Sequence, residues 1–190
     1  MKKVLAAAAA GLLALSLVGC GKEQAKTLEG KTGDTLSTMF FDYTVTNARL
    51  EDEMAGMLGH DGYKLLVVDV TVTNNGKNPI TMTDADFYIT WGDGDKDYDY
   101  PITMYDTTQL SDRQMPAKYE LQPEGSKSGE LIFAVPPETT EFGLKTQDYY
   151  TEGDSQEPVA GDIYTVSFKI GGEEAAPAEG ESAPAEEEGK

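Results

Sequence analysis

The segment that decides the fold is residues 63–80, which read YKLLVVDVTVTNNGKNPI. Apolar and polar side chains alternate along the second half of this strand-like segment, after the apolar run that follows Lys64. Leu66, Val68, Val70 and Val72 fall on one face, and Asp69, Thr71 and Thr73 fall on the other. Alternation with a period of two, in β-branched residues, is typical of a strand with one face against a core. The Asn-Asn-Gly that follows favours a turn.

The same alternation recurs along the middle of the chain. The expected inward sets are Met39, Phe41, Tyr43 and Val45; Phe87, Ile89 and Trp91; Leu131, Phe133 and Val135; and Tyr164, Val166, Phe168 and Ile170. Weaker strands are expected at residues 97–102, 119–121 and 142–145. Beyond the first twenty residues no stretch of ten shows a helical stripe. Seven or eight short strands separated by turn residues predict an all-β, antiparallel β-sandwich over residues 37–171.

The first residues have the three parts of an export signal. Lys2 and Lys3 precede an uncharged run, residues 4–18, and the small Gly19 comes before the chain's single cysteine, Cys20. Fifteen helical residues cover about 22 Å, less than the roughly 30 Å of a bilayer's hydrocarbon core. This favours a cleaved signal peptide, residues 1–19, over a membrane-spanning anchor.

The four residues LVGC, 17–20, resemble the lipobox of bacterial lipoproteins. The resemblance implies cleavage after Gly19 and lipidation of Cys20, with fatty acids such as palmitate holding the protein on the extracytoplasmic face of the bacterial cell membrane. The alternative is a plain secretory signal with a chance cysteine. A single thiol also excludes an internal disulfide and a zinc site built from cysteines.

The two flanks of the expected domain are polar. Residues 20–36 contain the lipidated cysteine followed by glycines and charges without an apolar period, which predicts a flexible tether. Residues 172–190 are rich in Glu, Ala and Pro and carry no large apolar side chain. Such a segment cannot bury enough surface to offset its ordering entropy, and it is therefore predicted to be a disordered acidic tail.

Three segments together resemble a known family. They are residues 63–80, FYITWGDGDKDYDY at 87–100, and LQPEGSKSGELIFAVPPE at 121–138. They are similar to a domain of unknown function found in secreted lipoproteins of Gram-positive bacteria. The resemblance covers roughly residues 38–170 and implies an immunoglobulin-like sandwich, similar in fold to a mycobacterial secreted immunoprotective antigen. It implies no catalytic residue.

The charge of the chain limits its partners. The formal net charge is −19, and without the first 19 residues the remaining 34 acids and 13 bases give −21. Nucleic acids bind through clustered Lys and Arg, so nucleic-acid binding is not expected.

The densest group of potential ligands is the acidic hairpin. Its members are Asp93, Asp95, Asp97 and Asp99, which alternate like the first half of a calcium-binding loop. Tyr98 and Met104 stand where that loop needs Gly and Glu, so the pattern is incomplete. The alternative is a solvated hairpin, with its aspartates toward water and Tyr98 and Tyr100 toward the core.

Two functional classes follow. The first is a lipid-anchored, non-catalytic binding module that engages a protein or another cell-envelope partner of unknown identity. The second is a lipoprotein that binds calcium or a small ligand through the acidic hairpin. An enzyme is not expected, because no nucleophile-and-base pattern stands out among the residues. No cofactor is expected other than this possible calcium.

Overall fold

The computed structural model describes residues 25–58, 62–94, 96–153 and 156–171. The expected signal peptide at 1–19, the lipidation site Cys20, the acidic tail at 172–190 and Asp95 of the hairpin lie outside the described residues. Within the described part of the chain, no helix has both the length and the apolar character needed to cross a membrane.

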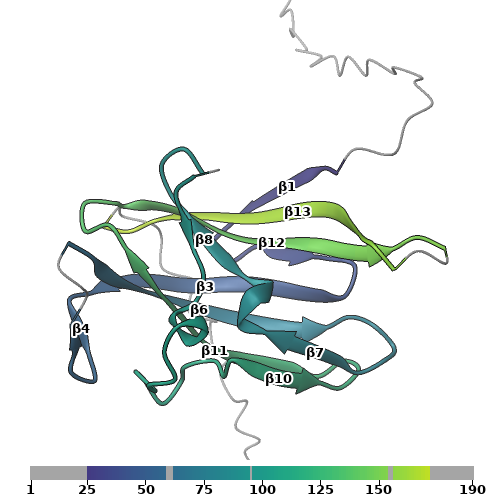
Figure 1. Ribbon diagram of the computed structural model, residues 1–190, viewed down its shortest axis with the longest axis horizontal. Helices are drawn as coiled ribbons and strands as arrows, with labels where there is room; N and C mark the ends of the chain where they lie inside the picture. Colours follow the sequence, from purple (N-terminus) through teal and green to yellow (C-terminus); the bar gives the residue numbers. More distant parts are fainter. Residues whose placement is uncertain (1–24, 59–61, 95, 154–155, 172–190) are drawn as a thin grey trace, which may run out of the picture.

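Strands make up most of the described structure (Figure 1). They are β1 (Thr27–Lys31), β2 (Thr35–Ser37), β3 (Phe41–Glu51), β4 (Glu53–Met54), β5 (Met57–Leu58), β6 (Lys64–Asn74), β7 (Ile80–Thr83), β8 (Tyr88–Thr90), β9 (Tyr98–Asp99), β10 (Lys118–Leu121), β11 (Ser126–Val135), β12 (Glu141–Thr151) and β13 (Pro158–Lys169). Two short 3₁₀ turns, η1 (Asp84–Asp86) and η2 (Ile102–Met104), interrupt the connections.

Two sheets form the sandwich. One has the order β1-β13-β12-β8-β9 and the other the order β11-β6-β3-β2, while β7 pairs with β10 and β4 with β5. All pairs are antiparallel except β1 and β13, which run parallel. The chain crosses from β6 in the four-stranded sheet to β8 in the five-stranded sheet. It then returns to β11 in the four-stranded sheet and crosses once more to β12 in the five-stranded sheet. These crossings are typical of immunoglobulin-like sandwiches and confirm the predicted fold class.

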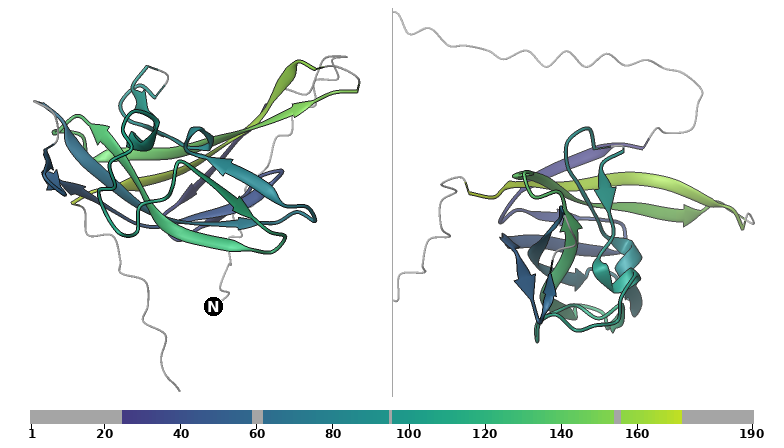
Figure 2. Two further views of the ribbon diagram at one scale, coloured as in Figure 1. Left: turned by 60° about the horizontal axis from the view of Figure 1, so that its bottom comes forward. Right: turned by 60° about the vertical axis from the view of Figure 1, so that its left-hand side comes forward.

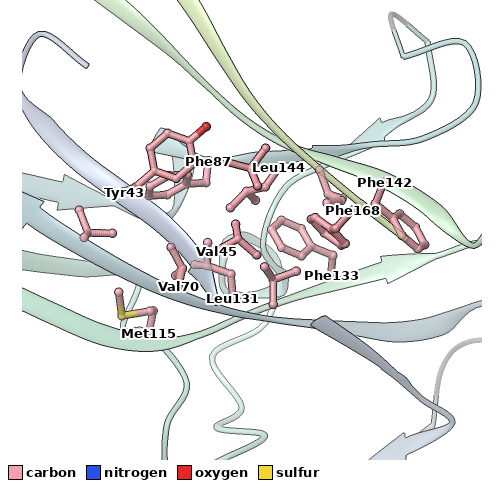
Figure 3. Packing of buried hydrophobic residues seen from close by; sticks show 14 of the residues in the cluster. Tyr43, Val45, Val70, Phe87, Met115, Leu131, Phe133, Phe142, Leu144 and Phe168 are labelled. Carbon is pink, nitrogen blue, oxygen red and sulfur yellow. The ribbon is translucent and has the colours of Figure 1, made fainter. Parts of the chain in front are cut away.

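The core lies between the sheets and contains the predicted inward faces. On β6, the side chains of Leu66, Val68, Val70 and Val72 are buried. They pack in one cluster with Tyr43 and Val45 of β3, Leu131 and Phe133 of β11, and aromatic side chains such as Phe87, Phe142 and Phe168 (Figure 3). The placement of Met39 in this core is wrong: its side chain is 54% exposed, because β3 begins only at Phe41.

A second apolar cluster covers the opposite face of β6 and β11. It contains Leu65, Val67, Leu110 and Ile132, with Met54 and Ile102 packed against it. Part of the connection between β9 and β10 therefore packs on the outside of the four-stranded sheet. The sequence predicted a strand buried on one face only, but the first half of β6 is buried on both.

Two buried carboxylates lie on this outer face. Asp69 and Glu130 sit opposite one another on β6 and β11, and each is within ion-pair distance of Arg49 and Arg113. The shortest contacts are 2.7 Å from Arg113 to Asp69 and 3.0 Å from Arg49 to Glu130. The Ser111 hydroxyl also donates a hydrogen bond to Glu130. Because buried carboxylates need such partners, this cluster fixes the 111–113 segment on the sheet.

The predicted tether at 20–36 is too long, because β1 and β2 lie inside it. β1 pairs with β13 from Thr27↔Ile163 to Lys31↔Ser167. Just before β1, the Lys26 backbone donates to Asp162 at 2.8 Å and its carbonyl accepts from Ile163 at 2.8 Å. β1 is an edge strand that is almost wholly exposed, so it carries no alternating apolar pattern that the sequence could have revealed. The folded domain therefore starts about ten residues earlier than predicted.

The hairpin of β12 and β13 is longer than the sequence suggested. Strand residues were expected at 142–145, but β12 continues to Thr151. Figure 2 shows the far end of this hairpin projecting beyond the rest of the sandwich. The register shifts between Gln147 and Tyr149, which places Asp148 opposite an irregular step in β13.

Candidate functional site

The acidic hairpin joins β8 to β9 through a tight turn. The Trp91 backbone donates to the Asp97 carbonyl at 3.0 Å, and the Gly94 backbone donates to Trp91 at 2.9 Å. Gly92 has a positive φ of 52°, and a Cβ there would come within 2.6 Å of the Asp97 carboxylate. That carboxylate accepts from the Asp93 backbone at 3.2 Å. Asp97 therefore closes the turn that the sequence predicted here.

The orientation predicted beyond the turn is wrong. The register pairs Tyr98 with Thr90, on the outer face of the sheet, and Asp99 with the buried Ile89. Tyr98 is 50% exposed, while Asp99 accepts hydrogen bonds from the Tyr100 backbone at 2.8 Å and the Tyr105 hydroxyl at 3.1 Å. The tyrosines thus face outward, and the aspartate is held by the chain around it.

The described aspartates of the hairpin do not converge. Within the ranges that the structure describes, no group of three or more His, Cys, Asp or Glu side chains is arranged to hold a metal ion. The ammonium group of Lys145 also lies near the turn, 3.7 Å from the position of a Cβ on Gly94. A cation in this place opposes a divalent ion beside it. Asp95 lies outside the described residues, so calcium binding by the four aspartates stays a prediction.

A groove runs along the outer face of the five-stranded sheet next to this hairpin. It is open to solvent and encloses about 660 Å³. Its floor includes Thr90, Gly143, Thr165 and Ser167 of β8, β12 and β13. The Thr90 hydroxyl donates to the Gly143 carbonyl at 3.2 Å, and a Cβ on Gly143 would be 3.0 Å from the Thr165 methyl group. Small side chains and a glycine therefore keep the floor low.

The rim of the groove is charged, while the Trp91 side chain beside it packs against the core. Trp91 and Gly92–Gly94 bound it on one side, while Lys145 and Glu29 contribute opposite charges. Glu141 and Lys169 form a surface ion pair at 2.8 Å on the same rim. The groove thus offers charged groups of both signs together with hydroxyl groups, and such polar groups fix the orientation of ligands at binding sites.

Three tyrosines lie on the same outer face. Tyr88, Tyr98 and Tyr100 contact one another with ring centroids 6.0–6.3 Å apart. The Tyr98–Tyr100 and Tyr88–Tyr98 pairs are edge-to-face, which holds the rings as a rigid group. We call these residues the tyrosine cluster. Thr90 joins it to the groove, because Thr90 pairs with Tyr98 across the strands and lines the groove floor.

Sequence reasoning found only one edge of this site. It indicated the hairpin, but the floor comes from β12 and β13, whose pairing joins residues far from the hairpin in the chain. Along β12, the inward Phe142 and Leu144 alternate with the outward Gly143 and Lys145. This alternation was the signal in the sequence that these two residues face the groove.

The fold and this surface define an antiparallel β-sandwich domain with an open groove on one sheet. A family model described as a domain of unknown function, DUF4352, matches residues 30–156. The chain belongs to this family, which confirms the expected domain of unknown function. No curated protein matches the sequence.

The chain is similar to solved structures of bacterial proteins. A candidate lipoprotein of Bacillus subtilis, ycdA, superposes with a TM-score of 0.51 at 19% identity over 74% of this chain; the match spans 39% of that longer protein. The yjhA protein of Bacillus subtilis has a TM-score of 0.49 at 15% identity, covering 71% of this chain and 99% of its own. An uncharacterized β-sandwich protein of Clostridium difficile has a TM-score of 0.43 at 12% identity, covering 78% and 99%.

Proposed function

We propose that this protein is a lipoprotein, anchored through Cys20 on the extracytoplasmic face of the bacterial membrane, which acts as a non-catalytic binding module. The observation that carries the binding role is the groove on the five-stranded sheet together with the adjoining tyrosine cluster. Exposed aromatic side chains on a rigid sheet lose little entropy on binding, and they are enriched at binding hot spots. The partner is a component of the cell envelope, since the anchor holds the domain there.

The membrane address rests on the lipobox-like LVGC at 17–20, and the ycdA similarity agrees with it. The similarity to the mycobacterial antigen stays a prediction. Non-catalytic action is supported by the family resemblance, which supplies no catalytic residue.

Cys20→Ser is expected to abolish lipidation. A serine hydroxyl does not replace the thiol that forms the thioether, so cells grown with a labelled palmitate analogue should label the unaltered chain and not the variant. Mass spectrometry of the unaltered protein should show Cys20 as the modified N-terminus. Lys22→Ala, just beyond the cysteine, is the control and should be labelled normally. An unlabelled chain that retains residues 1–19 contradicts the anchor.

Crosslinking from the tyrosine cluster should detect the partner. A photoreactive phenylalanine analogue in place of Tyr98 is expected to give a discrete adduct in intact cells, because Tyr98 is half exposed on the proposed binding surface. The same analogue at Tyr63, which is 48% exposed outside this surface, is the matched control.

A blocking variant tests whether the adduct depends on the groove. Ser167→Tyr places a large ring on the groove floor from an exposed position, so the core is not disturbed. It should remove the adduct formed at Tyr98. Equal adducts from positions 98 and 63, or an adduct that survives Ser167→Tyr, would exclude this surface as the binding site.

A further inference from the structure

The attachment point of the proposed anchor lies close to the folded body. The first described residue is Ala25, five residues after Cys20, and β1 begins at Thr27. Five residues span at most about 18 Å when fully extended. The polar headgroup layer of a bilayer is itself about 7 Å thick on each side. A domain attached in this way stays near the membrane surface, and the end of the sandwich that carries Ala25 is the end that can touch it.

A hollow lined by uncharged side chains lies at this end of the sandwich, next to the exposed Glu152 and Glu157 of the hairpin. Met39 and Phe40, in the turn between β2 and β3, join Tyr149, Tyr150, Thr151 and Pro158 of the projecting hairpin around a shallow hollow of about 430 Å³. We call these six residues the apolar patch. Met39, Phe40 and Tyr149 are 54%, 40% and 57% exposed. None of the six carries a charge, although the chain has 34 acidic residues among 190.

The chain holds this patch in place. The buried Asp148 accepts hydrogen bonds from the Met39 backbone, at 3.1 and 3.3 Å, and from the Tyr164 hydroxyl at 2.9 Å. The Thr38 hydroxyl accepts from the backbones of Phe40 and Phe41, both at 3.1 Å. Met39 and Phe40 are thus fixed in an exposed turn, so no rearrangement is needed to present them.

The apolar patch and the attachment point are neighbours. Ala25 and Lys26 line a second hollow, of about 350 Å³, together with Met39 and Tyr150 of the patch. Because β1 runs parallel to β13, Ala25 lies at the end of the five-stranded sheet from which the hairpin projects (Figure 1). The same end of the molecule therefore carries both Ala25, where the described chain begins, and the exposed apolar side chains.

We propose that the apolar patch docks on the interface of a phospholipid bilayer when Cys20 is lipidated, which rests on the proposed function. Tyr side chains favour the level of the headgroups, where the apolar ring and the polar hydroxyl are both satisfied, and Phe inserts on the apolar side of such interfacial segments. The rest of this acidic surface is repelled by anionic lipids, so an uncharged face is the one able to approach. The anchor raises the local concentration of the patch at the membrane, so that a weak affinity is enough.

The proposal predicts where a probe on the full-length lipoprotein contacts lipid. Lipidation consumes the thiol of Cys20, so an introduced cysteine is the single free thiol of the mature protein. An environment-sensitive fluorophore is attached to a cysteine at one of two positions. Tyr149→Cys lies in the apolar patch. Tyr63→Cys lies next to the start of β6, at the opposite end of β3. The two tyrosines are similarly exposed, and β3 alone separates its ends by about 33 Å. Both proteins are placed in phosphatidylcholine vesicles with and without lipids that carry a quencher.

We expect the label at 149 to shift to the blue and to be quenched by the lipid-borne quencher several-fold more than the label at 63. Met39→Ser with Phe40→Ser should reduce this quenching and leave vesicle binding unchanged, because the anchor is intact. A blue shift that grows with protein density, without quenching by the lipid-borne quencher, would mean that copies of the protein contact one another. That result would overturn the proposal.

Failure of the anchor has a different signature. A chain that does not float with the vesicles lacks the lipid, and both the anchor and the docking are then refuted. A chain that floats, with labels at 149 and 63 equally exposed to water, retains the anchor and refutes the docking alone. Circular dichroism of each variant checks that the sandwich is folded.

Discussion

Val70→Asp is expected to leave no folded domain. Val70 is fully buried in the middle of β6, where it pairs with Val45 on β3 and Gly129 on β11. A carboxylate at this position has no cation near it in the apolar core. Burying it unpaired costs several kcal/mol, which is comparable with the whole stability of about 5–15 kcal/mol for a domain.

Circular dichroism and thermal melting of the purified domain measure this effect. Thr71→Asp is the matched control, because Thr71 is on the other face of the same strand and its hydroxyl bonds to Ser128 at the surface, at 2.8 Å. The control should melt cooperatively with a small loss of stability. A normal melt for Val70→Asp would show that this face of β6 is not in the core.

Arg49→Met is expected to cause the second large loss of stability, about 2 kcal/mol. The substitution removes the cation 3.0 Å from Glu130, so that Arg113 is the cation that still pairs with the two buried carboxylates. Removing one partner of a buried ion pair costs about 3–5 kcal/mol. The expected loss of about 2 kcal/mol is smaller than this range, because Arg113 remains and Arg49 is partly exposed. Urea unfolding measures it. Lys169→Met, which breaks a surface pair with Glu141, is the control and should change little.

The pH dependence gives a second readout of the same cluster. Burial disfavours the charged form of Glu130, but the Ser111 hydroxyl and Arg49 outweigh it, so its pKa is lowered from the ordinary 4.5. A lowered pKa in the folded state adds stability above the unfolded pKa, and this stability is lost as the pH falls through the folded pKa. The difference between the unaltered protein and Arg49→Met should therefore be smaller at about pH 3 than at about pH 7. A difference that is equal at both would show that Glu130 is not the group concerned.

The alternating strands of the core could be predicted from sequence because burial on one face leaves a period of two. The two-sided burial of β6 was missed, although Leu65 and Val67 break the alternation and indicate that something covers the outer face. β1 could not be found, since a nearly exposed edge strand is held by backbone hydrogen bonds, which leave no apolar pattern.

The candidate site was less predictable than the core. The glycines of the hairpin correctly predicted a turn, because their positive φ values are costly for other residues. The direction of Tyr98 depended on the register of β9 against β8, and β9 is only two residues long. A one-residue change of register reverses every side chain, so a short strand gives the sequence too little pattern to decide it.

The parallel pairing of β1 with β13 has a mechanical consequence. If the chain is anchored through Cys20 as proposed, tension on it enters the fold at Lys26, just before β1, and runs along the strand. If a partner held at the groove pulls from the other end of the sheet, the five residue pairs between β1 and β13 are loaded in shear. Strands sheared past each other must lose their bonds together, whereas strands peeled apart lose them one by one. β1 would then resist the tension as a clamp under shear.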